Sequence, residues 1–139
     1  MTASVRIEEC EPARSMFAAD SASRALGIEI VDLRPGTATT TVTVGETMVN
    51  GHGITHGGYI FLLADTTFAL ACNSRGDAAV AARADVRFLR ATRLGDVLIA
   101  TAVERERFGR NGLYDVTVRR GDEVIAEFRG DSRTIPAGA

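Results

Sequence analysis

The sequence predicts an α+β domain in which mostly antiparallel strands wrap around one long buried helix. Residues 59–73 contain no Gly or Pro and are apolar on nearly every side, which is typical of a helix in a core. Two strand-like segments precede this helix and four follow it. One helix cannot supply the crossovers of repeated βαβ units, so the strands are expected to pair mainly antiparallel.

The central helix is expected to end near Gly76, a residue that favours a helix C-terminus. Asp65, Thr66 and Thr67 interrupt its apolar character, and the segment is too short for a convincing membrane span. We therefore expect no association with a membrane. Aromatic residues on this helix, such as Phe68, either pack in the core or line a ligand pocket.

The part of the chain before the central helix is predicted to form a cover helix and a β-hairpin. Residues 1–11 show no usable period and are expected to be frayed. Apolar residues recur at helical spacing over residues 12–26, with Gly27 as the stop. Residues 28–33 and 37–44 are rich in β-branched side chains and read as the two strands of the hairpin. A polar, glycine-rich loop over residues 45–58 then leads to the central helix.

The rest of the chain is predicted to form four strands that are separated by turns. They are expected at residues 80–90, 96–105, 113–120 and 123–133. Alternation of apolar residues is clearest at Val116 and Val118, and again at Val124, Ala126 and Phe128. This alternation implies a sheet with one covered face.

Length and composition favour one ordinary soluble domain that spans residues 1–139. The chain is 45% hydrophobic and 24% charged, with a net charge of −2, so no basic excess points to nucleic acid. Cys10 and Cys72 are expected to be reduced, and together with His52 and His56 they show no zinc-binding spacing. We therefore expect no bound metal ion. No secretory signal is visible, so we expect a cytoplasmic protein.

Two features at the start of the central helix carry candidate chemistry. Gly57 and Gly58 follow His56 where the first backbone N–H groups of a helix have no intrahelical acceptor, so a ligand oxygen with developing negative charge fits there. Alternatively, the glycines serve only a tight turn. Asp65 is a candidate catalytic carboxylate in a dry crevice. Alternatively, it is a core residue bonded to a hydroxyl such as that of Thr66, or it lies on an incidental solvent-exposed strip.

The spacing of Gly57 and Asp65 constrains any site that uses both residues. Eight positions on one helix correspond to about 12 Å along its axis, so the two groups cannot flank one carbonyl. If both act on one substrate atom, they come from two copies of the chain whose helices pack antiparallel across a two-fold axis. The hypothesis therefore predicts a homodimer with two shared sites.

The organisation resembles the hotdog fold, in which a curved antiparallel sheet wraps a central helix. The residues that carry the resemblance are those of its acyl-CoA thioesterases: Asn50-x-x-Gly53-x-x-His56-Gly57-Gly58, followed by Asp65. Within that superfamily the chain is most similar to the PaaI group of phenylacetate degradation. The narrower matches are the segments 25–30, 65–74, 88–90, 112–116 and 128–132. One departure is Ala91 after Arg90, where the group often has proline.

The resemblance implies hydrolysis of an aryl-acetyl-CoA or related thioester to free acid and coenzyme A, with no separate cofactor. Gly57 N–H would stabilise the oxyanion, assisted by Gly58, and Asp65 from the partner chain would act as general base or nucleophile. Asn50 holds the attacking water or staples its loop. His56 donates to the thioester or caps the helix. Basic residues are expected to contact the CoA phosphates, Arg90 foremost, and the group favours a dimer of dimers.

Two other functions are compatible with the same residues. A hotdog hydratase or dehydratase would use His56 and Asp65 as an acid/base pair at one carbon of an enoyl or hydroxyacyl thioester. A non-catalytic acyl-CoA-binding module would hold the ligand without turnover, and such a sensor is expected to carry a DNA-binding segment. The sequence favours the hydrolase over both.

Overall fold

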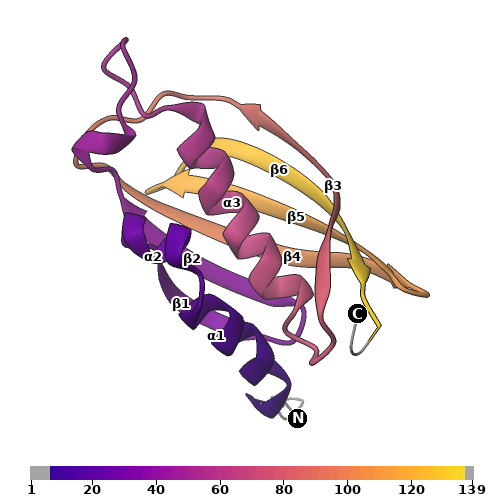
Figure 1. Ribbon diagram of the computed structural model, residues 1–139. Coiled ribbons are helices and arrows are strands. Elements are labelled where there is room, and N and C mark those ends of the chain that lie inside the picture. Colours follow the sequence, from indigo (N-terminus) through magenta and orange to yellow (C-terminus); the bar gives the residue numbers. More distant parts are fainter. Residues whose placement is uncertain (1–6, 137–139) are drawn as a thin grey trace.

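A curved antiparallel sheet of six strands wraps the long helix α3 (Gly57–Cys72), which lies against the inner face of the sheet (Figure 1). The structure is a computed structural model that describes residues 7–136. The strands are β1 (Glu29–Arg34), β2 (Thr37–Thr43), β3 (Ala79–Phe88), β4 (Val97–Phe108), β5 (Asn111–Arg120) and β6 (Glu123–Thr134). Their order across the sheet is β1-β2-β4-β5-β6-β3, and all neighbours are antiparallel. The predicted α+β hotdog architecture is confirmed.

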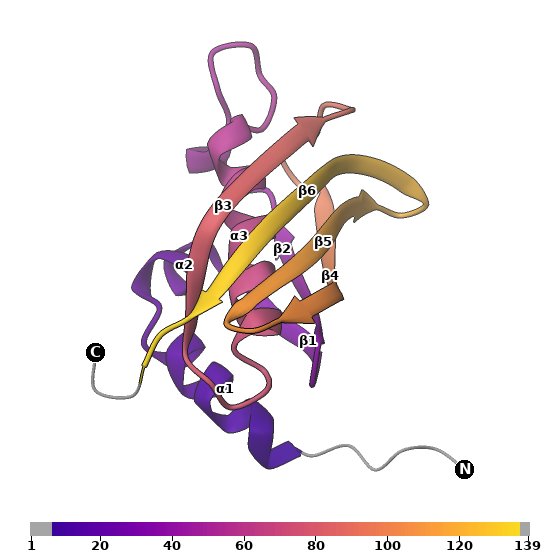
Figure 2. The same cartoon turned by 90° about the vertical axis from the view of Figure 1, so that its right-hand side faces the viewer.

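The chain order explains why β3 lies at an edge of the sheet. β4, β5 and β6 follow one another through tight turns, whereas β3 pairs only with β6, the last strand (Figure 2). β1 forms the other edge. β3 leaves α3 directly and runs beside it, so the helix and this edge strand border the same face of the molecule (Figure 1).

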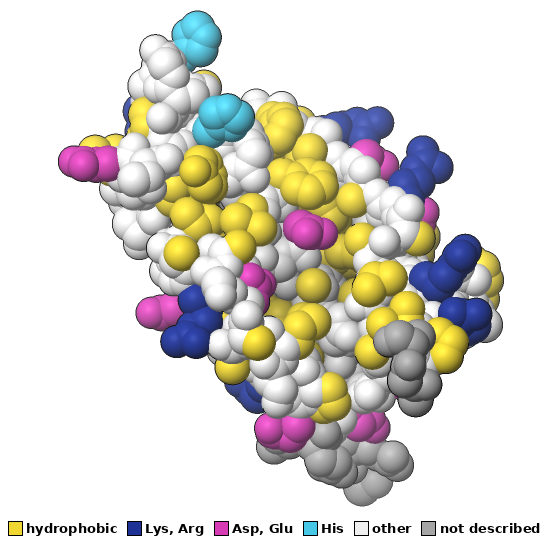
Figure 3. Space-filling view, viewed as in Figure 1, with side chains coloured by type: hydrophobic (Ala, Val, Ile, Leu, Met, Phe, Trp, Pro, Cys, Tyr) yellow, Lys and Arg dark blue, Asp and Glu magenta, His cyan; other side chains and the backbone are white. Residues whose placement is uncertain are grey.

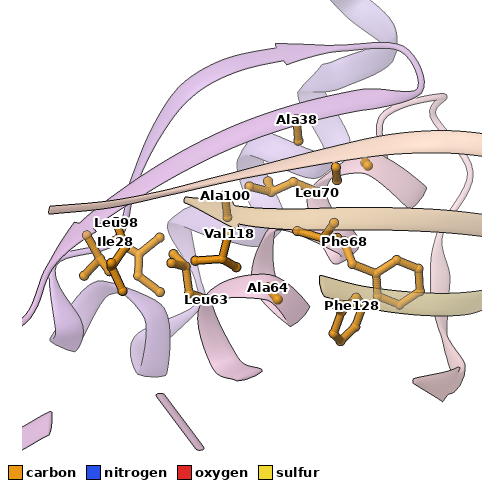
Figure 4. Packing of buried hydrophobic residues seen from close by; sticks show 14 of the residues in the cluster. Ile28, Ala38, Leu63, Ala64, Phe68, Leu70, Leu98, Ala100, Val118 and Phe128 are labelled. Atoms are coloured by element: carbon orange, nitrogen blue, oxygen red, sulfur yellow. The ribbon is translucent and has the colours of Figure 1, made fainter. Parts of the chain in front are cut away.

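The core lies between α3 and the inner face of the sheet (Figure 4). The Phe68 ring of α3 lies 5.6 Å from the rings of both Tyr114 and Phe128. Gly130 makes this packing possible, because a Cβ atom there would lie 2.9 Å from the Phe68 ring. The alternative that Phe68 lines a pocket is therefore wrong.

The alternation predicted in the last two strands is confirmed except at Val124. Val116, Val118, Ala126 and Phe128 are all buried. A register shift occurs where Val118 pairs with Ala126 but the next residue of β5 pairs with Val124. The residue left over, Ile125, forms a bulge and takes the buried position in place of Val124.

The N-terminal segment differs from the single cover helix that was predicted. It consists of η1 (Ile7–Cys10), α1 (Glu11–Ala18) and α2 (Ser21–Leu26). The chain breaks before α2 because Asp20 caps that helix, accepting a hydrogen bond from Ser23 N–H. Gly27 ends α2 with φ +82°, as predicted.

The expected fraying of residues 1–11 is wrong for residues 7–11, which form η1 and the start of α1. Cys10 anchors this segment because its side chain is 1% exposed and packs in the core. Residues 1–6 lie outside the described part of the chain.

The predicted loop over residues 45–58 also contains regular structure. The short helix η2 (Glu46–Met48) buries Met48, and an isolated bridge joins Val49 to Thr55. As a result α3 starts at Gly57, two residues earlier than expected.

The end of α3 is set by Asn73 rather than by Gly76. The Asn73 amide donates to the carbonyl oxygens of Ala69 (2.8 Å) and Ala79 (3.1 Å), and its Oδ1 accepts from Ala79 N–H (2.9 Å). Gly76 lies in the following turn with φ +96°. Asn73 therefore joins the last turn of the helix directly to the first residue of β3. Among residues 7–136 no helix combines the length and the hydropathy that crossing a bilayer requires.

Candidate active site

The first turn of α3 presents one backbone donor without an acceptor. His56 is the N-cap residue, and its Nδ1 accepts a hydrogen bond from Gly58 N–H at 3.2 Å. Tyr59 N–H donates to the His56 carbonyl at 3.0 Å. Within residues 7–136 the Gly57 N–H has no hydrogen-bond acceptor. The positive end of the helix therefore has one unused donor at Gly57, and His56 acts as the cap, one of its two predicted roles.

The turn that carries Gly57 is fixed by bonds to two other segments. His56 N–H donates to the Met48 carbonyl at 2.7 Å, and Thr55 N–H donates to the Thr92 carbonyl at 2.8 Å. The buried hydroxyls of Thr55 and Thr92 are also hydrogen-bonded, at 2.6 Å. These contacts hold the donor in place without help from a ligand.

Asn50 staples the loop before this turn. Its Oδ1 accepts from His52 N–H at 2.9 Å and from Ile54 N–H at 3.3 Å. Because both partners are donors, the oxygen must face them, and the amide nitrogen is directed elsewhere. That nitrogen has no hydrogen-bond partner in the described chain. The predicted role of Asn50 in stapling its loop is confirmed, and its amide nitrogen is available to a ligand.

A cleft of about 330 Å³ opens beside the first turn of α3. Its walls come from the stapled loop, the start of α3, and the end of β3 with the segment that follows it: Asn50, Ile54, Thr55, Gly57, Ile60, Phe88, Leu89, Arg90, Ala91 and Thr92. The Phe88 ring lies close to Gly57, since a Cβ atom built on Gly57 would be 3.1 Å from this ring. The walls are mainly apolar, which strengthens any hydrogen bond made by Gly57 N–H.

The cleft brings together three of the six predicted site residues, namely Asn50, Gly57 and Arg90. The Arg90 guanidinium donates to the Val124 carbonyl at 2.6 Å and lies 3.9 Å from the Glu123 carboxylate. Its side chain is about half exposed. Arg90 therefore sits at the mouth of the cleft, held against the β5–β6 turn.

Phe88 and Leu89 were not among the predicted site residues. Both side chains are more than half exposed, at 54% and 52%. Large apolar residues at the exposed end of an edge strand are the sequence signal that could have identified them. Only the fold shows that this strand ends beside Gly57.

Asp65 lies two turns further along α3 and does not line the cleft. Its side chain is half-buried, and the pKa of this carboxyl is raised, first by burial and then by the negative charge of Asp20. No hydrogen bond or ion pair satisfies it within residues 7–136. A half-buried carboxylate without a partner and with a raised pKa is typical of a functional group.

The two threonines after Asp65 are occupied by other partners. Thr66 Oγ1 lies 2.8 Å from Ser23 Oγ, so the alternative in which Thr66 satisfies Asp65 is wrong. Thr67 Oγ1 donates to the Leu63 carbonyl and lies 2.7 Å from the Thr40 hydroxyl. These bonds fix α3 to α2 and to β2 directly after Asp65.

Metal chemistry gains no support from the described side chains. Within residues 7–136 no three His, Cys, Asp or Glu residues cluster as metal ligands would. Both histidines lie on the surface, at the end of the molecule that holds the start of α3 (Figure 3).

Comparison with known proteins gives consistent relatives. A sequence profile described as Thioesterase superfamily matches residues 52–127. The acyl-coenzyme A thioesterase PaaI of Escherichia coli (strain K12) is 45% identical over 124 residues, which are 88% of this chain and 89% of that protein.

Solved structures agree with these relatives. The structure of the E. coli PaaI protein, from the phenylacetic acid degradation operon, matches with a TM-score of 0.89 and 42% identity, over 94% of this chain and 96% of that chain. The smu.793 protein of Streptococcus mutans, solved with bound acetyl CoA, matches with a TM-score of 0.75 and 27% identity, over 78% of this chain and 88% of that chain. The chain therefore belongs to the thioesterase superfamily, within the PaaI group of hotdog-fold acyl-CoA thioesterases.

Proposed function

We propose that this protein hydrolyses aryl-acetyl-CoA thioesters, such as phenylacetyl-CoA or hydroxyphenylacetyl-CoA, to free acid and coenzyme A in the cytoplasm. The observation that carries the hydrolysis is the unused Gly57 N–H at a helix N-terminus inside an apolar cleft. The aryl-acetyl group is supported by the similarity to the PaaI protein of a phenylacetic acid degradation operon.

The reaction that fits these groups is addition of water to the thioester carbonyl. Gly57 N–H binds the carbonyl oxygen and stabilises the negative charge that develops on it. Asp65 of the partner subunit takes a proton from water while the water oxygen bonds to the carbonyl carbon. The intermediate then collapses and the carbon–sulfur bond breaks. The thiolate of coenzyme A leaves and receives the proton that Asp65 had taken from water, which restores the carboxylate.

The raised pKa of Asp65 suits the role of general base, which we favour over that of nucleophile. Asn50 would position the water or the carbonyl through its unpartnered nitrogen. His56 supports the site by holding Gly58 N–H, which leaves Gly57 N–H as the donor. A single turnover in ¹⁸O-water separates the two roles of Asp65, because only the nucleophilic route leaves the label in its carboxylate.

A shared site requires a second copy of the chain, and two surfaces suit it. On α3, Leu62, Asp65 and Ala69 recur at helical spacing and remain partly exposed. Beside this stripe, β3 offers the unpaired edge of the sheet. Figure 3 shows hydrophobic side chains gathered over this face, with acidic side chains among them.

The charges along β3 are complementary to those of an antiparallel second copy. Arg83, Asp85 and Arg87 alternate in sign along the edge strand. A two-fold axis at Ala84 would place each Arg83 opposite an Asp85, and an axis at Val86 would pair Asp85 with Arg87. Either register also runs the two α3 helices antiparallel, which is the arrangement that a site shared between Gly57 of one copy and Asp65 of the other requires.

A dimer of dimers is proposed through the outer face of the sheet. Val97, Ile99 and Val103 point outward from β4 and are 51%, 42% and 40% exposed. Burial of this apolar strip against a second dimer would remove it from water.

Arg90 is proposed to contact the phosphates of coenzyme A. It sits at the mouth of the cleft, and its fixed position against Val124 would hold the positive charge there. We expect Arg90→Gln to raise KM for acyl-CoA while kcat changes little. An unchanged KM would remove Arg90 from the phosphate site.

The shared site is tested by mixing chains with different defects. Asp65→Ala chains and Gly57→Pro chains should each be inactive alone, whereas heterodimers contain one site with both groups intact. Recovered turnover after chain exchange is the expected result. Proven exchange without recovery would refute the composite site.

The acyl group is tested with a panel of CoA thioesters. Phenylacetyl-CoA and hydroxyphenylacetyl-CoA should give higher kcat/KM than benzoyl-CoA or straight-chain thioesters. The same panel includes crotonyl-CoA, whose hydration without hydrolysis would indicate the hydratase. Tight binding of every thioester with no turnover would indicate a binding module.

A further inference from the structure

At the break between α1 and α2, the carboxylate of Asp20 accepts a hydrogen bond from a buried hydroxyl group. Asp20 Oδ1 accepts from Ser23 N–H at 3.0 Å, and Asp20 Oδ2 accepts from Ser23 Oγ–H at 2.6 Å. The N–H bond alone would cap the helix. The second bond uses the other oxygen of Asp20 and links it to a side chain that is 0% exposed.

Ser23 passes this contact on to α3. Its Oγ lies 2.8 Å from Thr66 Oγ1, and Thr66 is 5% exposed. A carboxylate can only accept, so the single Ser23 proton goes to Asp20 and the Thr66 hydroxyl must donate to Ser23. The order Thr66 to Ser23 to Asp20 is therefore fixed, and both hydroxyl dipoles point toward the Asp20 charge.

The chain of bonds ends one residue from Asp65. Thr67, on the other side of Thr66, is tied to Thr40 of β2, so this turn of α3 is held from two elements. The Asp65 carboxylate itself has no hydrogen-bond or ion-pair partner in the described chain. Its position is set by the bonds of its neighbours.

The charges around Asp65 are few. From the α1–α2 break, Asp20 raises the pKa of Asp65 in addition to the effect of burial. On α3 itself, burial and the Asp65 charge raise the pKa of the Cys72 thiol to about 12, so that this thiol stays neutral. Within residues 7–136, neither α1 nor the strands that pack against α3 bring a charge that shifts the pKa of Asp65.

We propose that Asp20 is a positioning residue for Asp65: through Ser23 and Thr66 it fixes the turn of α3 that carries Asp65. The inference rests on the proposed role of Asp65 as general base. It assigns α2 a part in the reaction beyond covering the core.

The test is the pH dependence of kcat/KM in Asp20→Asn. Asn caps helices as well as Asp does, so the variant keeps the bond to Ser23 N–H. It removes the charge and also replaces the oxygen that accepts from Ser23 Oγ–H by an amide nitrogen, which can only donate. Loss of a like charge lowers the pKa of Asp65, so the acid limb of the profile should move to lower pH. Asp122→Asn is the matched control, because it makes the same charge change at an exposed position in the β5–β6 turn.

A second variant separates position from charge. Ser23→Ala interrupts the bonded chain but keeps the Asp20 charge. We expect kcat to fall by about tenfold or more with KM little changed, because small displacements of a catalytic group are costly. The acid limb should move less than in Asp20→Asn.

Each outcome is decisive. If the acid limb of Asp20→Asn coincides with that of Asp122→Asn, the charge effect is refuted. If Ser23→Ala keeps full kcat, the positioning effect is refuted. Asp65→Asn distinguishes these failures from failure of the proposed function, since an active Asp65→Asn enzyme would overturn the general base itself.

Discussion

Replacing Gly57 by proline removes the bare N–H and leaves the start of α3 intact. Gly57 is the first residue of the helix, where proline is well tolerated because no intrahelical bond is lost. The preceding residue, His56, has ψ 132°, an extended conformation that a following proline accepts. The variant therefore deletes one donor and little else.

The added ring atoms need their own control. A Cβ atom at position 57 would lie 3.1 Å from the Phe88 ring, and Phe88 is 54% exposed, so its ring has room to turn toward solvent. Gly57→Ala places the same Cβ atom there and keeps the N–H. The difference between the two variants isolates the hydrogen bond from the steric contact.

Loss of one oxyanion donor typically lowers kcat by about 10²–10³-fold. We expect a loss of that order in Gly57→Pro and a clearly smaller one in Gly57→Ala. The assay follows the release of free CoA thiol at saturating phenylacetyl-CoA, with thermal unfolding measured for each variant. If the proline variant keeps the kcat of the alanine variant, the Gly57 N–H does not stabilise the oxyanion.

Three further predictions concern stability. Because burial raises the folded-state pKa of Asp65, its ionisation opposes folding above that pKa; Asp65→Asn should unfold at a higher temperature than wild type at pH 7, and the gain should vanish below about pH 4, where the unfolded carboxyl is protonated. His56→Ala loses the cap on Gly58 N–H and should lower the free energy of unfolding by about 1 kcal/mol in urea titrations, whereas His56→Asn, which keeps an acceptor, should lower it less. Glu104 accepts two bonds from Arg75, at 3.0 and 3.1 Å, so Glu104→Ala should cost about 1–3 kcal/mol by the same assay, and a cost near zero would show that this pair is screened by solvent.

Elements with a strong local signal could be predicted from the sequence. The apolar run of α3 and the β-branched strands required no long-range information, and their predicted types are confirmed. The break at Asp20 was also visible, as an acidic cap three residues before Ser23. It was missed because the apolar spacing on either side continues as if the helix were unbroken.

The remaining differences depend on contacts that the sequence does not reveal. The bulge at Ile125 follows from the register of β5 against β6, which only the folded sheet defines. Phe88 reaches Gly57 because β3 turns back beside the start of α3, a long-range arrangement. Within the candidate site, motif residues such as Asn50 and Gly57 were predictable, whereas the apolar walls were not.

The clamp formed by Asn73 has a mechanical consequence. This side chain binds the last turn of α3 and the first residue of β3 at once, so the rod that carries Asp65 and the strand at the open edge cannot shift independently. A second chain that pairs with the open edge of β3 would therefore also act on α3. Pairing of two chains would then change the position of the Asp65 carboxylate. Without the Asn73 hydrogen bonds, turnover would no longer depend on this pairing.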